Sequence, residues 1–176
     1  MRIITGQFKG RRFDIPRSFK ARPTTDFAKE NIFNVLNGYI DFEGATALDL
    51  FAGTCSISLE LLSRGCAQVV SVEADREHYQ FIRQCIAKID TENSVLIRGD
   101  VFRFLKSCHQ HFDLVFADPP NALERLPELP DLVLNGDLLT PDGIFVLEHG
   151  KKEDFSSHSR FFEHRCYGSV NFSLFR

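Results

Sequence analysis

The sequence predicts an α/β protein built on a mostly parallel, doubly wound sheet with helices on both faces. Three observations predict it. From Ala45 onward, short apolar segments rich in β-forming residues alternate with segments of helical periodicity. A glycine turn follows the first of the apolar segments, and an acidic residue follows each of three later ones. The chain has 176 residues, of which 43% are hydrophobic and 26% charged, and this is the composition of one ordinary globular domain.

The first 24 residues predict a β-hairpin arm, ahead of a main domain at residues 25–176. Two short segments that contain apolar residues, 2–5 and 11–15, flank a stretch bounded by glycines. Residues 1–25 carry seven basic side chains and a single acid, whereas the whole chain has a formal net charge of −3. A basic arm on an acidic body is typical of proteins that bind phosphates, nucleic acids included. The alternative is a solvated, disordered tail.

The remaining elements follow in chain order. A helix is predicted to begin at Asp26, because Thr25 favours the N-cap position and an acid favours the first turn. Its apolar stripe consists of Ala28, Ile32, Phe33 and Leu36, and Gly38 ends it. Strands are then expected at 47–51, 68–72, 94–97, 112–117 and 144–148, with helices at about 56–64, 76–89 and 101–107. The last part of the chain predicts a proline-interrupted helix at 123–134, a turn at 140–143 and an antiparallel hairpin of 161–165 with 170–175. Five parallel strands and a closing hairpin make a seven-stranded sheet.

A nucleoside site is predicted at one rim of this sheet. The turn Ala52-Gly53-Thr54 follows the first strand of the alternation, and Glu73 ends the next strand, 20 residues after Gly53. In a doubly wound sheet such a turn lets a ligand approach the backbone, and the acid binds both ribose hydroxyls. Asp100 and Asp118 follow two further strands, so that three acids meet at the rim and would repel a pyrophosphate. The full G-x-G-x-x-G turn is also missing, and S-adenosylmethionine, a nucleoside without phosphates, fits the pattern. The expected cofactor-binding residues are Asp49, Phe51, Gly53, Thr54, Glu73, Asp100 and Val101.

The stretch Asp118-Pro119-Pro120 follows a strand at 112–117 and predicts a site that holds an amino group. Proline fixes φ and has no N–H, and Pro119 keeps Asp118 out of the helical region. The result is a stiff, extended tip that presents a carboxylate beside a backbone carbonyl without a competing donor. Two fixed acceptors side by side are suited to binding an NH₂ group. The alternative is an ordinary Pro-Pro turn at a strand end.

The cysteines, the histidines and the apolar runs indicate neither a metal centre nor a membrane protein. The five cysteines are scattered without a C-x-x-C pair, so reduced, buried thiols are expected rather than disulfides or zinc ligands. His109 and His111 are close together, but no cysteine or acid completes a ligand set at metal spacing. No apolar run approaches 18 residues and the start of the chain has no signal-peptide pattern, which favours a cytoplasmic location.

Short motifs spread from Met1 to the C-terminus carry a family resemblance. They are Arg2-Ile3-Ile4, Gly6-x-Phe8-Lys9-Gly10-Arg11-Arg12, Arg22-Pro23-Thr24-Thr25-Asp26, Leu48–Thr54, Ser63-Arg64-Gly65, Asp118-Pro119-Pro120 and Tyr167-Gly168. Together they resemble the RsmD family, Rossmann-like class I methyltransferases that use S-adenosylmethionine to methylate the exocyclic N2 of a guanine in bacterial 16S ribosomal RNA. The Asp-Pro-Pro signature is shared with DNA adenine methyltransferases, so DNA adenine-N6 methylation is the alternative reaction.

The resemblance implies a partner and a set of site residues. The partner is 16S ribosomal RNA, alone or in a partly or fully assembled 30S subunit, and the enzyme is expected to be a monomer. The implied catalytic residues are Asp118, Pro119, Pro120 and Asn121, and the implied RNA contacts are Arg2, Lys9, Arg11, Arg12, Arg22, Thr24 and Thr25.

Three positions depart from the family pattern. Asn121 stands where the family has an aromatic ring that stacks on the target base, and Cys55 and Ser58 stand where it has glycines. Cys55 carries a Cβ, which disfavours positive φ and narrows the approach of the cofactor. A second alternative is therefore a catalytically weakened protein that binds RNA or assists ribosome assembly.

Overall fold

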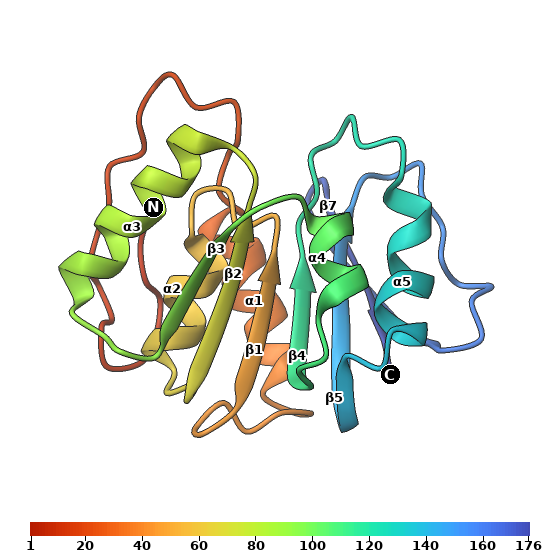
Figure 1. Ribbon diagram of the computed structural model, residues 1–176. Helices are drawn as coiled ribbons and strands as arrows, with labels where there is room; N and C mark the ends of the chain where they lie inside the picture. The colour runs from red at the N-terminus through yellow and green to blue at the C-terminus, as the bar shows by residue number, and fades with distance from the viewer.

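The computed structural model describes residues 1–176 and contains seven strands, five α-helices and one 3₁₀ helix (Figure 1). The strands are β1 (Thr46–Leu50), β2 (Gln68–Glu73), β3 (Ser94–Arg98), β4 (Phe112–Ala117), β5 (Leu139–His149), β6 (Phe161–Tyr167) and β7 (Val170–Phe175). The helices are α1 (Asp26–Leu36), α2 (Ser56–Ser63), α3 (Arg76–Ile89), α4 (Val101–Ser107), η1 (Leu126–Glu128) and α5 (Leu129–Asn135). None of these helices is long and apolar enough to cross a membrane.

All seven strands form one sheet in the order β3-β2-β1-β4-β5-β7-β6. The first five pair in parallel, and β7 lies antiparallel between β5 and β6. The α/β class, the five parallel strands and the closing hairpin predicted from the sequence are therefore confirmed.

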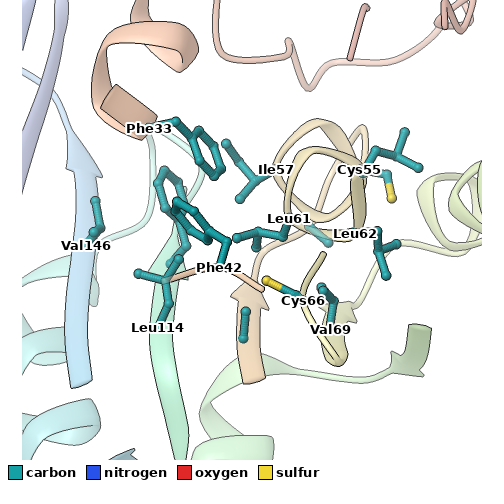
Figure 2. Packing of buried hydrophobic residues seen from close by; sticks show 14 of the residues in the cluster. Phe33, Phe42, Cys55, Ile57, Leu61, Leu62, Cys66, Val69, Leu114 and Val146 are labelled. Atoms are coloured by element: carbon teal, nitrogen blue, oxygen red, sulfur yellow. The ribbon is translucent and has the colours of Figure 1, made fainter. Parts of the chain in front are cut away.

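Helices cover both faces of the sheet because the central strands are apolar on both sides. Successive side chains of a strand point to opposite faces. Ala47 of β1 and Leu114 of β4 belong to the larger core, which α1, α2 and α3 cover (Figure 2). Leu48 and Val115, the next residues along the same strands, belong to the second core under α4 and α5. Strands buried on both faces are typical of parallel sheets, so the continuous apolar runs correctly indicated interior strands.

The helix starts follow the capping chemistry of the sequence. Thr25 caps α1 as predicted, and its hydroxyl accepts a 3.2 Å hydrogen bond from the amide of Ala28. Asp75 and Asp100 cap α3 and α4 in the same way, at 2.9 and 3.0 Å from the amides they accept. Each cap satisfies one amide that the first helical turn leaves free. These caps also fix where the chain turns after β2 and β3.

Two predicted elements differ from the structure. The expected turn at 140–143 lies within β5, where the pairing with β4 shifts from Phe112–Leu139 to Leu114–Ile144. The four residues bulge out of the ladder, so that one strand continues across the predicted turn. The expected helix at 123–134 begins only at Leu129, after the one-turn η1, because Pro127 and Pro130 are tolerated only near a helix start.

The N-terminal arm is fastened to the main domain. Its hairpin is reduced to one isolated bridge between Arg2 and Arg12, with amide-to-carbonyl bonds of 3.0 Å from Ile3 to Arg11 and from Phe13 to Met1. Ile3 and Phe13 are buried in the core that α1, α2 and α3 cover. Residues 1–24 thus share a core with the rest of the chain.

The cysteines are free thiols of two kinds. Cys55, Cys66 and Cys85 are buried, as expected, and burial raises the pKa of each. Cys108 is half-buried and Cys166 is exposed, so the expectation of burial is wrong for these two. Cys108 follows the last turn of α4, and Cys166 lies on the edge strand β6.

Candidate active site

The carboxyl ends of the parallel strands bring the predicted site residues to one rim. In the ladders Leu50 pairs with Val72 and with Ala117, and Ala117 pairs with Leu147. The residues that come next, Phe51, Glu73, Asp118 and Glu148, therefore lie along the same edge. Asp100 lies two residues past β3 and caps α4 there. This edge is where doubly wound sheets bind ligands.

Glu73 closes the glycine turn from the neighbouring strand. The amide of Gly53 donates a 2.7 Å hydrogen bond to Glu73 Oε2, and the amide of Asp75 donates a 2.8 Å bond to Oε1. Gly53 has a φ of 53°, in the left-handed region that glycine adopts readily. The predicted pairing of turn and acid is thus a direct contact. A carboxylate has about four acceptor sites, so each oxygen of Glu73 retains capacity for a further donor.

Asp49 lies behind the turn rather than on the pocket surface. It is 1% exposed, and its Oδ2 accepts a 2.5 Å hydrogen bond from the Ser58 hydroxyl. Ser58 Oγ also lies 2.7 Å from Ser71 Oγ on β2. Burial raises the pKa of Asp49 to about 7, against the lowering effect of the Ser58 hydrogen bond. Ser58 thus offers a hydroxyl that binds this buried acid, a contact that could not be predicted from the sequence.

The turn itself is built with two residues in the left-handed region besides Gly53. Phe51 has a φ of 61° and Cys55 a φ of 68°, a conformation that costs energy for residues with a Cβ. Cys55 occupies the N-cap of α2 and makes no side-chain capping bond. Position 55 thus has a backbone conformation that glycine adopts more readily than cysteine.

A segment that no sequence signal indicated covers the turn. The ring of Phe19 packs 4.4 Å from His78 and 5.3 Å from Phe81, both on α3. Ala21 follows it, and its Cβ lies 3.8 Å from where a Cβ on Gly53 would be. The chain between arm and α1 therefore runs over the predicted cofactor turn. The residues next to Phe19 in the sequence show no helical or strand-like spacing of apolar side chains. No sequence pattern therefore predicted that Phe19 is buried.

The Asp118-Pro119-Pro120 tip has the free acceptor that the sequence predicted. No protein donor bonds to the Pro119 carbonyl, whereas the Pro120 carbonyl accepts a 2.9 Å bond from the amide of Leu123. Pro120 and Asn121 are exposed, and Asp118 is half-buried. A carboxylate and an unbonded carbonyl thus stand next to each other at the end of β4.

Asp118 has a second acid beside it. Glu148 of β5 follows Leu147, the partner of Ala117, and accepts a 3.0 Å hydrogen bond from the Thr24 hydroxyl. Burial, and then the charge of Glu148, raise the pKa of Asp118 well above its ordinary value. Burial also raises the pKa of Glu148, to about 7. Thr24, implied as an RNA contact, is buried at this pair, and Thr25 is occupied as the helix cap.

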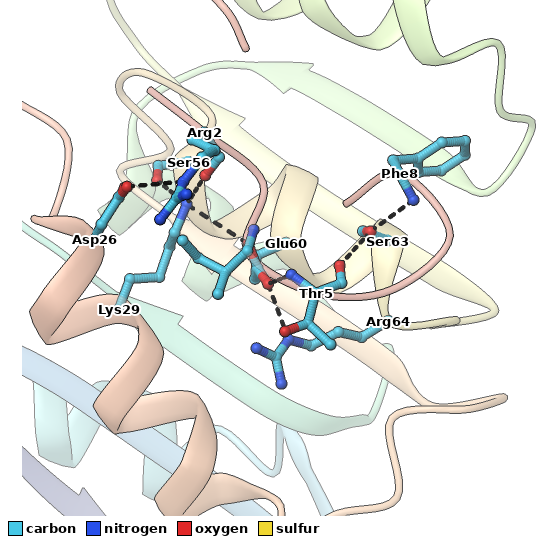
Figure 3. A network of polar contacts seen from close by, with 10 residues as sticks. Arg2, Thr5, Phe8, Asp26, Lys29, Ser56, Glu60, Ser63 and Arg64 are labelled. Atoms are coloured by element: carbon cyan, nitrogen blue, oxygen red, sulfur yellow. Dashed lines mark hydrogen bonds and ion pairs between the residues drawn. The ribbon is translucent and has the colours of Figure 1, made fainter. Parts of the chain in front are cut away.

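The arm is attached to α2 through a buried charge network (Figure 3). Glu60 accepts hydrogen bonds from the amides of Ile4 at 2.8 Å and Thr5 at 3.0 Å. Lys29 lies 3.6 Å from the same carboxylate and donates to Ser56 Oγ and the Arg2 carbonyl. Neither Lys29 nor Glu60 was singled out in the sequence. A lysine on one helix and an acid on another have no characteristic spacing that would predict their contact.

The basic side chains of the arm differ in how they are engaged. Lys9, Arg12 and Arg22 are exposed and make no ion pair. Arg2 pairs with Asp26 at 3.1 Å, and Arg11 donates to the Lys88 carbonyl at 3.0 Å. The arm therefore keeps exposed positive charge on the outside of a buried attachment.

A large cavity lies away from this rim. It has a volume of about 880 Å³ and opens at the amino ends of the strands, between Gln7, the segment 37–43 and Arg64. It is wide, and Asp41 and Glu43 give it acidic walls. None of the predicted site residues lines it.

Comparisons with known proteins identify the family of the chain. The family model described as Conserved hypothetical protein 95 matches residues 1–176. The chain is 33% identical over 148 residues to "Ribosomal RNA small subunit methyltransferase D" of Escherichia coli (strain K12), across 84% of this chain and 74% of that protein. It is 29% identical over 182 residues to the protein of the same name from Haemophilus influenzae, across 100% of this chain and 93% of the relative. Among solved structures, the putative methyltransferase yhhF from Escherichia coli matches with a TM-score of 0.87 at 28% identity, over 99% of this chain and 96% of that one.

The rim fits the methyl donor S-adenosylmethionine. Glu73 has acceptor sites left for two ribose hydroxyls, beside a turn whose Gly53 carries no side chain. The acids that meet there suit a ligand without phosphates and with a cationic sulfonium. By the match along its whole length and by this fold, the chain belongs to the RsmD family of S-adenosylmethionine-dependent methyltransferases.

Proposed function

We propose that the protein methylates the exocyclic N2 of a guanine in 16S ribosomal RNA. The observation that carries the proposal is the pair of adjacent acceptors at the end of β4, the Asp118 carboxylate and the unbonded Pro119 carbonyl. An NH₂ group has two donors, and these two acceptors match it. The names of the small-subunit ribosomal RNA methyltransferases at 33% and 29% identity support the choice of RNA.

The protein acts mainly by orienting the amine. An amino group conjugated with a purine ring is a poor nucleophile, because its lone pair is delocalised. Acceptance of its two N–H bonds by Asp118 and Pro119 draws the nitrogen toward tetrahedral geometry and directs the lone pair outward. S-adenosylmethionine supplies a methyl group that the sulfonium already activates, so that no strong general base is needed. Alignment of this kind contributes roughly 7–11 kcal/mol in favourable cases.

Asp118 also stabilises the charge that develops on the amine. The nitrogen becomes cationic as its bond to the methyl carbon forms, and an ionised carboxylate beside it lowers the energy of that state. The same nitrogen then becomes acidic and loses one proton. Asp118 is the acceptor within reach of it.

The RNA would approach along the arm and the start of α1. Lys9, Arg12 and Arg22 offer exposed positive charge for phosphates, a contact independent of sequence. Phe27, which is 63% exposed in the first turn of α1, lies edge-on to Tyr167 with ring centroids 6.1 Å apart. Tyr167 is near the rim, because β7 begins opposite the end of β5. This aromatic pair offers a stacking surface for an unpaired base, which Asn121 does not.

One experiment tests the proposed reaction against its alternatives. Purified protein and cofactor with a labelled methyl group are incubated with unmodified 16S RNA, with 30S subunits lacking the modification and with DNA, and the nucleosides are analysed. We expect labelled N2-methylguanosine from one of the two ribosomal substrates. Labelled N6-methyladenine in the DNA would establish the alternative reaction. Binding of RNA without any labelled nucleoside would favour the assembly factor.

A further inference from the structure

The loop between β4 and η1, residues 118–125, is fastened to α4 by the side chain of Arg125. The guanidinium carbon of Arg125 lies 3.9 Å from the centre of the Phe102 ring, in a cation–π contact. Two hydrogen bonds to the Glu128 carboxylate, at 3.0 Å from Nε and 2.7 Å from Nη2, hold the guanidinium in one orientation. Arg125 is therefore fixed in place, although its side chain is 48% exposed.

The backbone of this loop has little else to hold it to the domain. The hydrogen bonds of residues 119–125 stay within the loop and η1, as from the Leu123 amide to the Pro120 carbonyl and from the Leu126 amide to the Leu123 carbonyl. Asn121 is exposed, and Leu123 packs only half-buried against the core under α4 and α5. The position of the loop thus depends on side-chain packing, to which Arg125 contributes the contact with α4.

Phe102 connects this contact to the predicted cofactor site. It lies in the first turn of α4, directly after Asp100 and Val101, and is 7% exposed. Its ring stands edge-on to the ring of Phe51, with centroids 6.4 Å apart. Phe51 belongs to the turn that contains Gly53. Arg125, Phe102 and Phe51 therefore form one row of contacts from the loop to the cofactor turn.

We propose, on the basis of the proposed function, that Arg125 is a positioning residue that makes the β4–η1 loop respond to the cofactor. A cofactor held by the Gly53 turn and by Asp100 restricts the first turn of α4, and Phe102 with it. Arg125 passes this restriction to the loop that carries Asn121 next to the acceptors for the amine. RNA then meets a loop that is already ordered and binds at a lower ordering cost.

Amide hydrogen exchange with and without S-adenosylhomocysteine tests this connection in the absence of RNA. In wild type, this reaction product should slow exchange of the Leu123 and Leu126 amides about threefold or more. In Arg125→Ala this slowing should be lost, whereas the Gly53 amide in the cofactor turn should slow in both proteins. Equal slowing of the loop amides in the variant, or none in wild type, would overturn the proposal.

RNA binding supplies a second readout, with unmodified 16S RNA as the probe. Wild type should bind it about 3- to 10-fold more tightly with S-adenosylhomocysteine than without, and Arg125→Ala should lose this gain. Arg125→Lys keeps a cation but not the planar fork, so it should recover only part of the gain. Arg103→Ala, at an exposed arginine of α4 without such a stack, is the matched control. A full gain in Arg125→Ala would contradict the proposed role.

The partner of Arg125 is tested by a double-mutant cycle. Phe102→Leu keeps an apolar side chain but removes the aromatic face, so it should lose the gain as Arg125→Ala does. The double variant should lose no more than either single variant, because both changes break the same contact. Additive losses would show that Arg125 does not act through Phe102. A loop that orders as described, without methyl transfer to any RNA, would refute the proposed function separately.

Discussion

The amide of Gly53 donates a 2.7 Å hydrogen bond to Glu73 Oε2, across the gap between the turn after β1 and the end of β2. The second oxygen of Glu73 accepts from Asp75 at 2.8 Å, at the start of α3. One carboxylate thus fixes the turn, the strand end and the next helix before any ligand arrives. A ligand that binds this acid meets a site already in place, and this lowers the ordering cost of binding.

The cofactor affinity should depend on Glu73. Glu73→Ala removes both acceptors for the ribose hydroxyls and releases the Gly53 amide, so we expect the Kd for S-adenosylmethionine to rise about tenfold or more. Titration calorimetry measures it. Glu77→Ala, at the exposed start of α3, is a control. An unchanged Kd in Glu73→Ala would exclude this acid from the cofactor site.

The stability of the cofactor-free protein should fall as the pH rises through the titration of Asp49. Its folded pKa is about 7, against an ordinary value of 3.8, so the folded state binds more protons than the unfolded state between these limits. A shift of this size corresponds to up to about 4 kcal/mol lost between pH 4 and pH 7. In the variant Asp49→Asn, the side-chain oxygen can still accept the hydrogen bond from Ser58, but the side chain does not ionise.

Thermal unfolding between pH 4.5 and pH 8 checks this expectation. The Tm of wild type should decrease more over this range than the Tm of Asp49→Asn. Glu148, whose folded pKa is also about 7, contributes a decline of the same sign in both proteins. Parallel curves for the two proteins would mean that Asp49 does not titrate in this window.

The sequence predicted those parts of the fold and of the site that follow from local signals. Thr25 caps α1 and Glu73 meets the glycine turn, because capping residues and strand-end acids act on nearby backbone. Thr24 was expected to contact RNA but is buried. Lys29 and Glu148 were not singled out from the sequence. Each acts through a partner distant in the chain, 124 residues away in the bond between Thr24 and Glu148. No spacing rule predicts such a pair before the topology is known.

The bulge in β5 could not be predicted for a related reason. Thr140-Pro141-Asp142-Gly143 has the composition of a turn, and locally it leaves the ladder. The residues on either side of this segment nevertheless pair with β4. Because pairing with a neighbouring strand outweighs the local preference for a turn, β5 continues through the segment.

RNA binding should depend on the exposed charge of the arm. We expect the triple variant Lys9→Ala, Arg11→Ala, Arg12→Ala to bind RNA less tightly and to flatten the plot of log K against log salt by about 2 in slope. Cofactor affinity should be unchanged, because the buried attachment through Glu60 is left intact. Binding is measured by fluorescence anisotropy at several salt concentrations. Equal slopes in wild type and variant would place the RNA on another surface.

The aromatic pair of Phe27 and Tyr167 should contribute stacking that position 121 lacks. Phe27→Ala is expected to lower kcat/KM for RNA about 5- to 100-fold, since base–aromatic stacking contributes about 1–3 kcal/mol. Asn121→Tyr should raise kcat/KM by a similar factor and restore part of the activity of Phe27→Ala. Tyr39→Ala, another exposed ring, serves as the control. A Phe27→Ala enzyme with wild-type kcat/KM would remove the pair from the RNA path.

The central claim is that Asp118 orients and stabilises the reacting amine, and single-turnover methyl transfer by Asp118→Ala tests it most directly. With cofactor and RNA both saturating, we predict that the variant loses more than about 100-fold in rate while both affinities stay within a few-fold of wild type. The carboxylate matters most as the amine becomes cationic, so its loss should affect the transition state more than binding. A variant that keeps more than about a tenth of the wild-type rate, a loss below roughly 1.4 kcal/mol, would contradict the account.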